Sequence, residues 1–294
     1  MPYAQAAGAK LYYEETGSGH PIVFVHEFSA DYRTWETQVR WFSREYRCIA
    51  FNARGYPPSD VPADATVYGQ DHATDDIAAV MNHLGLSEAH IVGLSMGASA
   101  ALHFGIRYAQ MATALVVAGC GSGALDALAF RKLSKEMAAR WRKDGALAMA
   151  KESAVSPTRV QLRNKDRRGW EEFVRYLGEH SASGSANTME NYQALRPSLF
   201  DLKDRIAKIT TPTLLIVGDE DEPCLETNLF LKRTIPSAGL LMVPRTGHGV
   251  NLEEPALFND AVQAFFSTVE RGRWSARDPI SRAAGIQTRM RENT

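Results

Sequence analysis

The sequence predicts an α/β protein with a mostly parallel, doubly wound sheet of about eight strands and a helical cap inserted after the sixth strand. Two observations support this fold class. Short apolar runs, typical of strands covered on both faces, alternate with segments of helical spacing. A long stretch without any such run then separates the first six predicted strands from the last two.

The predicted elements follow one another without long gaps in the first part of the chain. Residues 3 to 16 predict two short strands that turn at Gly8, and PIVFVH predicts the third. Helical spacing from Trp35 to Phe42 leads to a fourth strand in RCIAFN. The next elements are a helix in QDHATDDIAAVMNHLGL, a strand in AHIVGLS, a helix in GASAALHFGIRYA and a strand in TALVVAG. Further on, TPTLLIVGD and GLLMVP add two strands, each followed by a helical segment.

The chain is predicted to divide into an α/β core, a cap and a tail. Residues 1–120 and 211–270 form the core, and residues 121–210 form a helical cap over the carboxyl ends of the strands, where open α/β sheets bind ligands. The basic runs RWRK and RNKDRR in the cap are expected to be solvated helix faces. Residues 271–294 form a basic tail that packs on its own body or on a neighbouring subunit, the second giving a homodimer.

The bulk composition argues against several classes of partner. The chain has 294 residues, 45% of them hydrophobic, and a formal net charge of −1, which gives no reason to expect nucleic acid or an anionic membrane as partner. Three scattered cysteines do not suggest a disulfide framework or a zinc site, and Cys48 is expected to be a buried thiol. Because no leader or long apolar segment is evident, we expect a cytoplasmic protein. We expect no metal or other cofactor, because no constellation of ligand residues is visible in the sequence.

The pentapeptide GLSMG, residues 93 to 97, is the strongest chemical signal. It fits G-x-S-x-G between a predicted strand and a predicted helix, the context of a nucleophile elbow. The tight turn strains Ser95 and exposes its hydroxyl, and side chains at Gly93 and Gly97 would collide with neighbouring backbone. Ser95 is therefore the candidate nucleophile.

A serine nucleophile needs a base, and the base needs a carboxylate to orient it. Among the eight histidines, His248 follows the last predicted strand in a loop at the carboxyl edge of the sheet, so it is the candidate base. The preceding strand ends in a run of acidic residues, and chemistry alone does not choose among them: Asp219, Glu220, Asp221 and Glu222.

Five motifs together resemble the α/β-hydrolase family, in the branch of 3-oxoadipate enol-lactonases and small carboxylesterases. The motifs are HEFSADYRTW (26–35), NARGYPPSD (52–60), GLSMG (93–97), PTLLIVGDED (212–221) and GHGVNLEEP (247–255). The resemblance implies that Asp221 is the triad carboxylate, with Asp219 as the alternative, and that the cap shapes the substrate pocket. It also implies an oxyanion hole formed by the amides of Phe28 and Met96.

The chain departs from that family at Glu27, where glycine usually follows the histidine. We expect Glu27 to point into the pocket mouth and tune substrate choice, disfavouring anionic acyl groups, or else to fold outward onto an arginine such as Arg54. His26 is expected to be a structural histidine. Asn52 replaces a frequent aspartate, which favours a loop-anchoring role for Arg54. Phe28 favours small to medium acyl groups.

The predicted function is hydrolysis of a carboxylic ester or (enol-)lactone of a small-molecule substrate through an acyl-enzyme on Ser95. A serine at the elbow argues against the haloalkane dehalogenases and epoxide hydrolases of this fold, which use a carboxylate there. Two alternatives stay open. One is a carbon–carbon bond hydrolase of ring-cleavage products, although Leu94 stands where such enzymes often have asparagine. The other is a ligand receptor that retains a slow triad.

Overall fold

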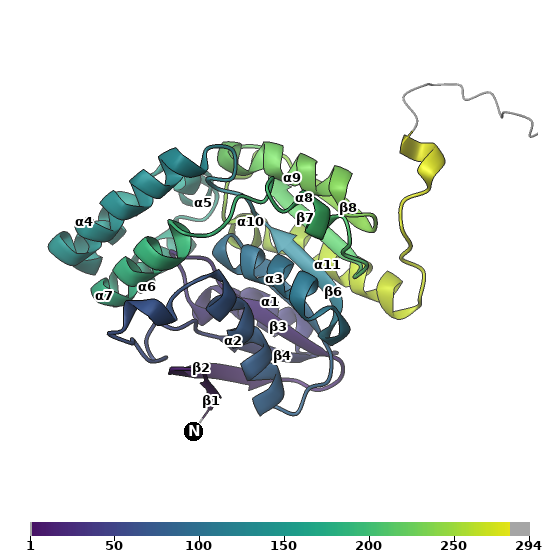
Figure 1. Cartoon of the computed structure of the whole chain (residues 1–294), viewed down its shortest axis with the longest axis horizontal. Helices are drawn as coiled ribbons and strands as arrows, with labels where there is room; N and C mark the ends of the chain where they lie inside the picture. The colour runs from purple at the N-terminus through teal and green to yellow at the C-terminus, as the bar shows by residue number, and fades with distance from the viewer. Residues whose placement is uncertain (1, 283–294) are drawn as a thin grey trace, which may run out of the picture.

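A single eight-stranded sheet forms the centre of the molecule in a computed structural model that describes residues 2–282 (Figure 1). The strand order is β1-β2-β4-β3-β5-β6-β7-β8; β1 and β2 are antiparallel to their neighbours, and the other strands pair in parallel. The bounds are β1 Tyr3–Ala6, β2 Ala9–Thr16, β3 Pro21–Val25, β4 Arg47–Phe51, β5 Ala89–Leu94, β6 Ala112–Ala118, β7 Thr213–Gly218 and β8 Ala238–Val243. The predicted, mostly parallel sheet is confirmed.

Both faces of the sheet are covered because alternate side chains of each central strand enter different apolar cores. On β3, Val23 joins the core shared with α2, α3 and α9, whereas Phe24 joins the core shared with α1 and α11. These helices span α1 Glu36–Phe42, α2 Gln70–His83, α3 Met96–Arg107, α9 Glu222–Thr234 and α11 Pro255–Glu270, and the short α10 Val250–Glu253 precedes the last. The result is a three-layer sandwich whose parallel strands all end at one edge.

The predicted cap segment, residues 121–210, lies between β6 and β7 and is helical. Its helices are α4 Ala127–Ser153, α5 Val160–Lys165, α6 Arg167–Gly178, α7 Ala182–Asn187 and α8 Lys203–Ile206. Figure 1 shows α4, α6 and α7 gathered beside one another, apart from β8 and the C-terminal tail. A third apolar cluster joins Trp141, Phe173 and Leu177 of this segment to Phe28 and Met96 of the core. The segment therefore shares an apolar cluster with residues that follow β3 and β5.

The tail after α11 first packs on its own chain. Trp274 lies against Phe265 with ring centroids 4.6 Å apart, and its indole N–H donates to the Ser237 carbonyl. The Arg277 amide donates to the Pro236 carbonyl at 2.9 Å. The expected tail interface extends to residues 283–294, which lie outside the described residues. Within the described part of the chain, no helix is both long and apolar enough to cross a membrane.

Replacing Trp274 by alanine tests whether this contact stabilises the core. We expect Trp274→Ala to lower the free energy of unfolding by about 1–3 kcal/mol, because it removes a partly buried aromatic contact and a hydrogen bond. Guanidinium-induced unfolding followed by circular dichroism measures the change. Ile280→Ala, at a side chain that is 74% exposed, is the control and should be nearly neutral. Equal stability of Trp274→Ala and wild type would contradict the packing.

Candidate active site

The nucleophile elbow joins β5 to α3. Ser95 has φ 55° and ψ −108°, a strained conformation for a residue with a side chain. Its amide donates to the Ala118 carbonyl at 2.8 Å, which ties the turn to the end of β6. The predicted strain at Ser95 is present, and the residue stands at the carboxyl edge of the sheet.

The two glycines of the elbow are required by close backbone contacts. A Cβ atom at Gly93 would lie 2.3 Å from the Gly97 carbonyl oxygen, and one at Gly97 would lie 2.1 Å from the Val25 carbonyl oxygen. Real Cβ atoms do not approach backbone so closely, so the predicted collision is confirmed. The contact at Gly97 also brings the first turn of α3 directly against the end of β3.

This contact places the two predicted oxyanion donors on neighbouring segments. Met96 begins α3, where free N–H groups and the helix dipole favour negative charge. Phe28 follows β3 in the loop that Gly97 touches. Within the described part of the chain, neither amide donates a hydrogen bond to another residue, so both are free to bind a substrate oxygen.

His26 fixes the peptide group that carries the Phe28 amide. Its Nδ1 lies 2.7 Å from the Glu27 carbonyl oxygen, and the Ala53 amide donates to its Nε2 at 3.0 Å. Because Nε2 accepts, Nδ1 must carry the proton and donate. Burial lowers the pKa of His26 to about 4, which keeps the ring neutral. The contacts fit the structural role expected for His26.

His248 is held by Asp221, at the end of β7. The His248 Nδ1 atom lies 2.8 Å from Asp221 Oδ2, and both residues are buried. Asp219, the alternative carboxylate, instead accepts the Thr246 amide at 3.2 Å. The geometry therefore favours Asp221 as the partner of His248 and gives Asp219 a role in holding the histidine loop.

Glu253 holds the loop on both sides of His248. Its carboxylate accepts the Gly247 amide at 2.6 Å and the Gly249 amide at 3.1 Å. Glu253 belongs to α10, so the loop is fixed to the helix that follows it. Glu253 lies within the motif GHGVNLEEP, and its role was not predicted from the sequence.

Burial and a neighbouring carboxylate act in opposite directions on His248. Burial alone would lower its pKa, but the charge and hydrogen bond of Asp221 outweigh burial and hold the pKa well above the ordinary value. Because Nδ1 is hydrogen-bonded to the Asp221 carboxylate, Nε2 is the nitrogen that can exchange a proton with a hydroxyl.

Ser95 and His248 lie on either side of the end of β6. The Ser95 amide bonds to Ala118, and a Cβ atom at Gly119 would lie 3.4 Å from His248 Nδ1. Within the described residues, Ser95 Oγ makes no hydrogen bond. The direction of the Ser95 hydroxyl is set by rotation about the Cα–Cβ bond. Hydrogen bonds between a nucleophile and its base often become short only when substrate is bound. The Ser95–His248 hydrogen bond stays a prediction.

Glu27 points inward and is buried beside His248. Its Oε2 atom accepts from Arg159 Nη2 and lies 3.9 Å from His248 Nε2. Arg54 does not pair with Glu27, because its guanidinium bonds to Asp76. Glu27 therefore has an arginine partner as the alternative expected, but this partner is Arg159 of the cap segment instead of Arg54, and the side chain is buried instead of turned outward.

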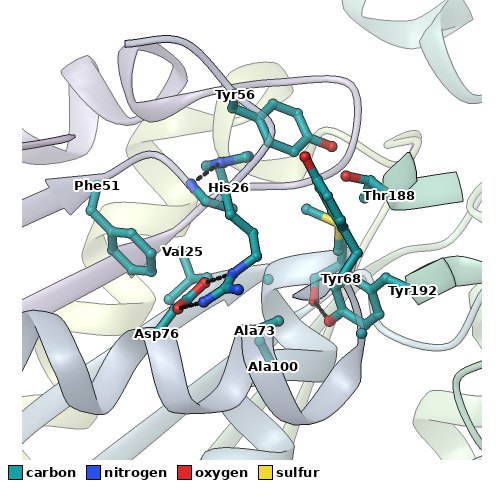
Figure 2. Close-up of a pocket in the computed structure, with 15 residues that line it drawn as sticks. Val25, His26, Phe51, Tyr56, Tyr68, Ala73, Asp76, Ala100, Thr188 and Tyr192 are labelled. Atoms are coloured by element: carbon teal, nitrogen blue, oxygen red, sulfur yellow. Dashed lines mark hydrogen bonds and ion pairs between the residues drawn. The ribbon is translucent and has the colours of Figure 1, made fainter. Parts of the chain in front are cut away.

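A pocket lies next to the elbow. Figure 2 shows Tyr68 and Tyr192 on one side of it and Phe51 on the other. Arg54 lines this pocket, but its donors are used by Asp76 and by the carbonyls of Ala7 and Val67, as expected for a loop anchor. The lining residues are Val25, His26, Phe51, Ala53, Arg54, Tyr56, Tyr68, Gly69, Ala73, Asp76, Met96, Gly97, Ala100, Thr188 and Tyr192.

Cys224 lies beside the Asp221–His248 pair. Its Sγ lies 4.0 Å from His248 Nδ1 and 3.3 Å from the Gly119 carbonyl oxygen. Burial raises the pKa of this thiol, which keeps it protonated and poorly nucleophilic. Asp221, Cys224 and His248 offer three possible metal-ligand atoms within 4.8 Å of one another, but Asp221 and His248 already bond to each other.

Comparison with known proteins decides the family. The family model described as the alpha/beta hydrolase fold matches residues 20–255. The chain belongs to the α/β-hydrolase family. This confirms the resemblance and the expectation of a hydrolase.

Individual relatives of this α/β-hydrolase are distant. It is 28% identical to AB hydrolase superfamily protein YisY of Bacillus subtilis, over 87% of this chain and 94% of that protein. It is 27% identical to 3-oxoadipate enol-lactonase 2 of Acinetobacter baylyi, over 83% of this chain and 87% of that protein. A solved thermophilic esterase from Thermogutta terrifontis is 26% identical, with a TM-score of 0.81, covering 90% of this chain and 97% of the esterase.

Besides the contacts of Glu253, three side-chain contacts at the site were not predicted from the sequence. Arg159 reaches Glu27 from a 3₁₀ turn of the cap segment. The hydroxyls of Tyr56 and Tyr192 donate to the carbonyls of Phe28 and Met96, at 3.0 Å and 3.1 Å. No local pattern marks these three side chains, because their partners are far away in the sequence.

The raised pKa of His248 sets the expected pH dependence. A general base acts only when neutral, so kcat/KM on an ester should fall as pH is lowered, with a midpoint above the ordinary histidine value of 6.5. Asp221→Asn should lower kcat by roughly 10⁴-fold and move the midpoint to lower pH. Steady-state kinetics from pH 5 to 10 measure both. Asp219→Asn is the control, and an unmoved midpoint in Asp221→Asn would contradict the assignment.

Proposed function

We propose that the protein is a serine hydrolase that cleaves a carboxylic ester or (enol-)lactone of a small to medium substrate through an acyl-enzyme on Ser95. The observation that carries the proposal is the buried Asp221–His248 hydrogen bond at the sheet edge where the strained elbow exposes Ser95. The relatives named as an enol-lactonase and an esterase support the same class of substrate.

The first half of the reaction forms the acyl-enzyme. Ser95 Oγ attacks the carbonyl carbon while His248 Nε2 takes the hydroxyl proton, and Asp221 stabilises the imidazolium. The amides of Phe28 and Met96 bind the oxygen on which negative charge develops. The tetrahedral intermediate then breaks its carbon–oxygen bond, and the imidazolium gives its proton to the leaving alkoxide or enolate.

The second half releases the acid. A water molecule attacks the acyl carbon, His248 takes one of its protons, and the amides again bind the oxyanion. The intermediate expels Ser95 Oγ, which recovers its proton from His248. For a lactone the alkoxide stays attached to the acyl part, so the product is a single hydroxy or oxo acid.

The cap segment, residues 121–210, shapes the apolar part of the pocket in this proposal. Trp141 packs edge-on against Phe28 with centroids 5.9 Å apart, directly above a proposed oxyanion residue. An apolar hollow beside this pair is lined by Phe28, Ser29, Met137, Trp141, Met149, Glu152, Ser153, Ser156, Leu177 and Met189. Its mostly apolar lining would suit the hydrocarbon part of an acyl chain.

A nucleophile substitution tests the proposal. Ser95→Ala should lower kcat/KM on p-nitrophenyl butyrate by at least about 10³-fold, because the covalent route is lost. Ser99→Ala, one turn further along α3, is the matched control and should keep most activity. Wild type should show sustained multiple turnovers. A single stoichiometric burst would instead support a ligand receptor, and activity retained in Ser95→Ala would contradict the proposal.

A further inference from the structure

A buried ion pair connects the core to the cap segment at the candidate active site. Arg159 Nη2 donates to Glu27 Oε2, and each residue is only 2% exposed. The Arg159 guanidinium lies over the Phe173 ring at 4.4 Å, which fixes its plane. Arginine stays charged even when buried, so it must have an anion beside it. Glu27 supplies that anion from within the protein.

The pair leaves several polar atoms without partners. In the described structure, Glu27 Oε1 and the Nε and Nη1 atoms of Arg159 are buried and make no hydrogen bond. Unmet donors and acceptors are costly in a folded interior. A purely structural pair in a bidentate arrangement would satisfy more of them, as Arg54 and Asp76 do with two hydrogen bonds. Arg159 therefore retains two donor atoms with which a further acceptor could bond.

The Glu27–Arg159 pair also lies beside the atoms that are proposed to react. Glu27 Oε2 is 3.9 Å from His248 Nε2, the proposed proton acceptor, and Glu27 directly precedes Phe28, a proposed oxyanion donor. Nη1 of Arg159 and Oε1 of Glu253 both approach Gly249, next to His248. Arg159 therefore faces the carboxylates of two residues within a few ångströms of the histidine.

We propose that Arg159 is a carboxylate-binding residue of the substrate pocket and that Glu27 occupies it internally, so the enzyme accepts uncharged esters and lactones and rejects those whose acyl chain carries a terminal carboxylate. The inference rests on the proposed function and names its substrate class. A substrate carboxylate would have to share Arg159 with Glu27, and two like charges in a buried site repel strongly. Removing the Glu27 charge opens the arginine to the substrate.

Matched esters test this selectivity. The substrates are p-nitrophenyl hexanoate and mono-p-nitrophenyl adipate, which have equal chain length and differ in a terminal carboxylate. Wild type should prefer the hexanoate ester. Glu27→Gln should raise the adipate-to-hexanoate ratio of kcat/KM by at least about tenfold, since about 1.4 kcal/mol of relieved repulsion suffices. Arg159→Gln should lower the ratio, because it leaves Glu27 as an unopposed negative charge.

Asp76→Asn is the control, because it breaks another buried arginine–carboxylate pair without touching His248. It should leave the ratio unchanged. The inference is overturned if Glu27→Gln and Arg159→Gln both leave the ratio within about twofold of wild type, or if wild type hydrolyses both esters equally well.

A binding measurement separates this inference from the proposed function. In a Ser95→Ala background, adipate should raise the melting temperature of the Glu27→Gln variant but not that of the parent protein. This readout needs no turnover. If wild type lacks Ser95-dependent hydrolysis while adipate still stabilises only the Glu27→Gln variant, the proposed function fails and the carboxylate site stands. Equal effects of adipate on both proteins overturn the site.

Discussion

The close approach of α3 to the end of β3 is the contact on which the site depends. It is possible only because Gly97 has no side chain to meet the Val25 carbonyl oxygen, 2.1 Å from where a Cβ would lie. The same approach forces Ser95 into a strained turn and sets the Met96 amide beside the Phe28 segment. The positions of the proposed nucleophile and of the two proposed oxyanion donors thus follow from one backbone contact.

The other side of the site is built from carboxylates that hold a single histidine. Asp221 accepts a hydrogen bond from the His248 ring, and Asp219 accepts one from the Thr246 amide. Glu253 accepts hydrogen bonds from the amides of the residues before and after His248. Each is a charge-assisted hydrogen bond; those of Asp221 and Glu253 are buried, whereas that of the exposed Asp219 is only partly buried. This arrangement fixes the loop, but it also surrounds the histidine with negative charge. Arg159 from the cap segment offsets that charge next to Glu27.

The fold could be predicted from the sequence, and the residues of the proposed triad could be named from it, because both follow local patterns. Apolar runs between turn signals gave all eight strands, and the parallel order brings their carboxyl ends together. G-x-S-x-G marks Ser95 through the backbone geometry that it requires. Choosing Asp221 over Asp219 needed the family resemblance, since both follow the same strand.

The contacts between core and cap could not be predicted in the same way. Arg159 lies 132 positions from Glu27, in a segment with many other basic residues, and nothing local distinguishes a buried arginine from a solvated one. Glu27 itself was recognised as a departure, but its partner depends on how the cap segment packs. Tyr56 and Tyr192 are likewise identified only by the backbone carbonyls that they reach.

Covalent labelling tests the central claim, which is that His248 activates Ser95 at the carboxyl edge of the sheet. Wild-type protein treated with diisopropyl fluorophosphate should gain one adduct by intact mass, located on Ser95 by peptide mapping. In His248→Ala the labelling rate should fall by at least about 100-fold, because the hydroxyl loses its base. An adduct on another residue, or equal labelling rates in the two proteins, would contradict the account.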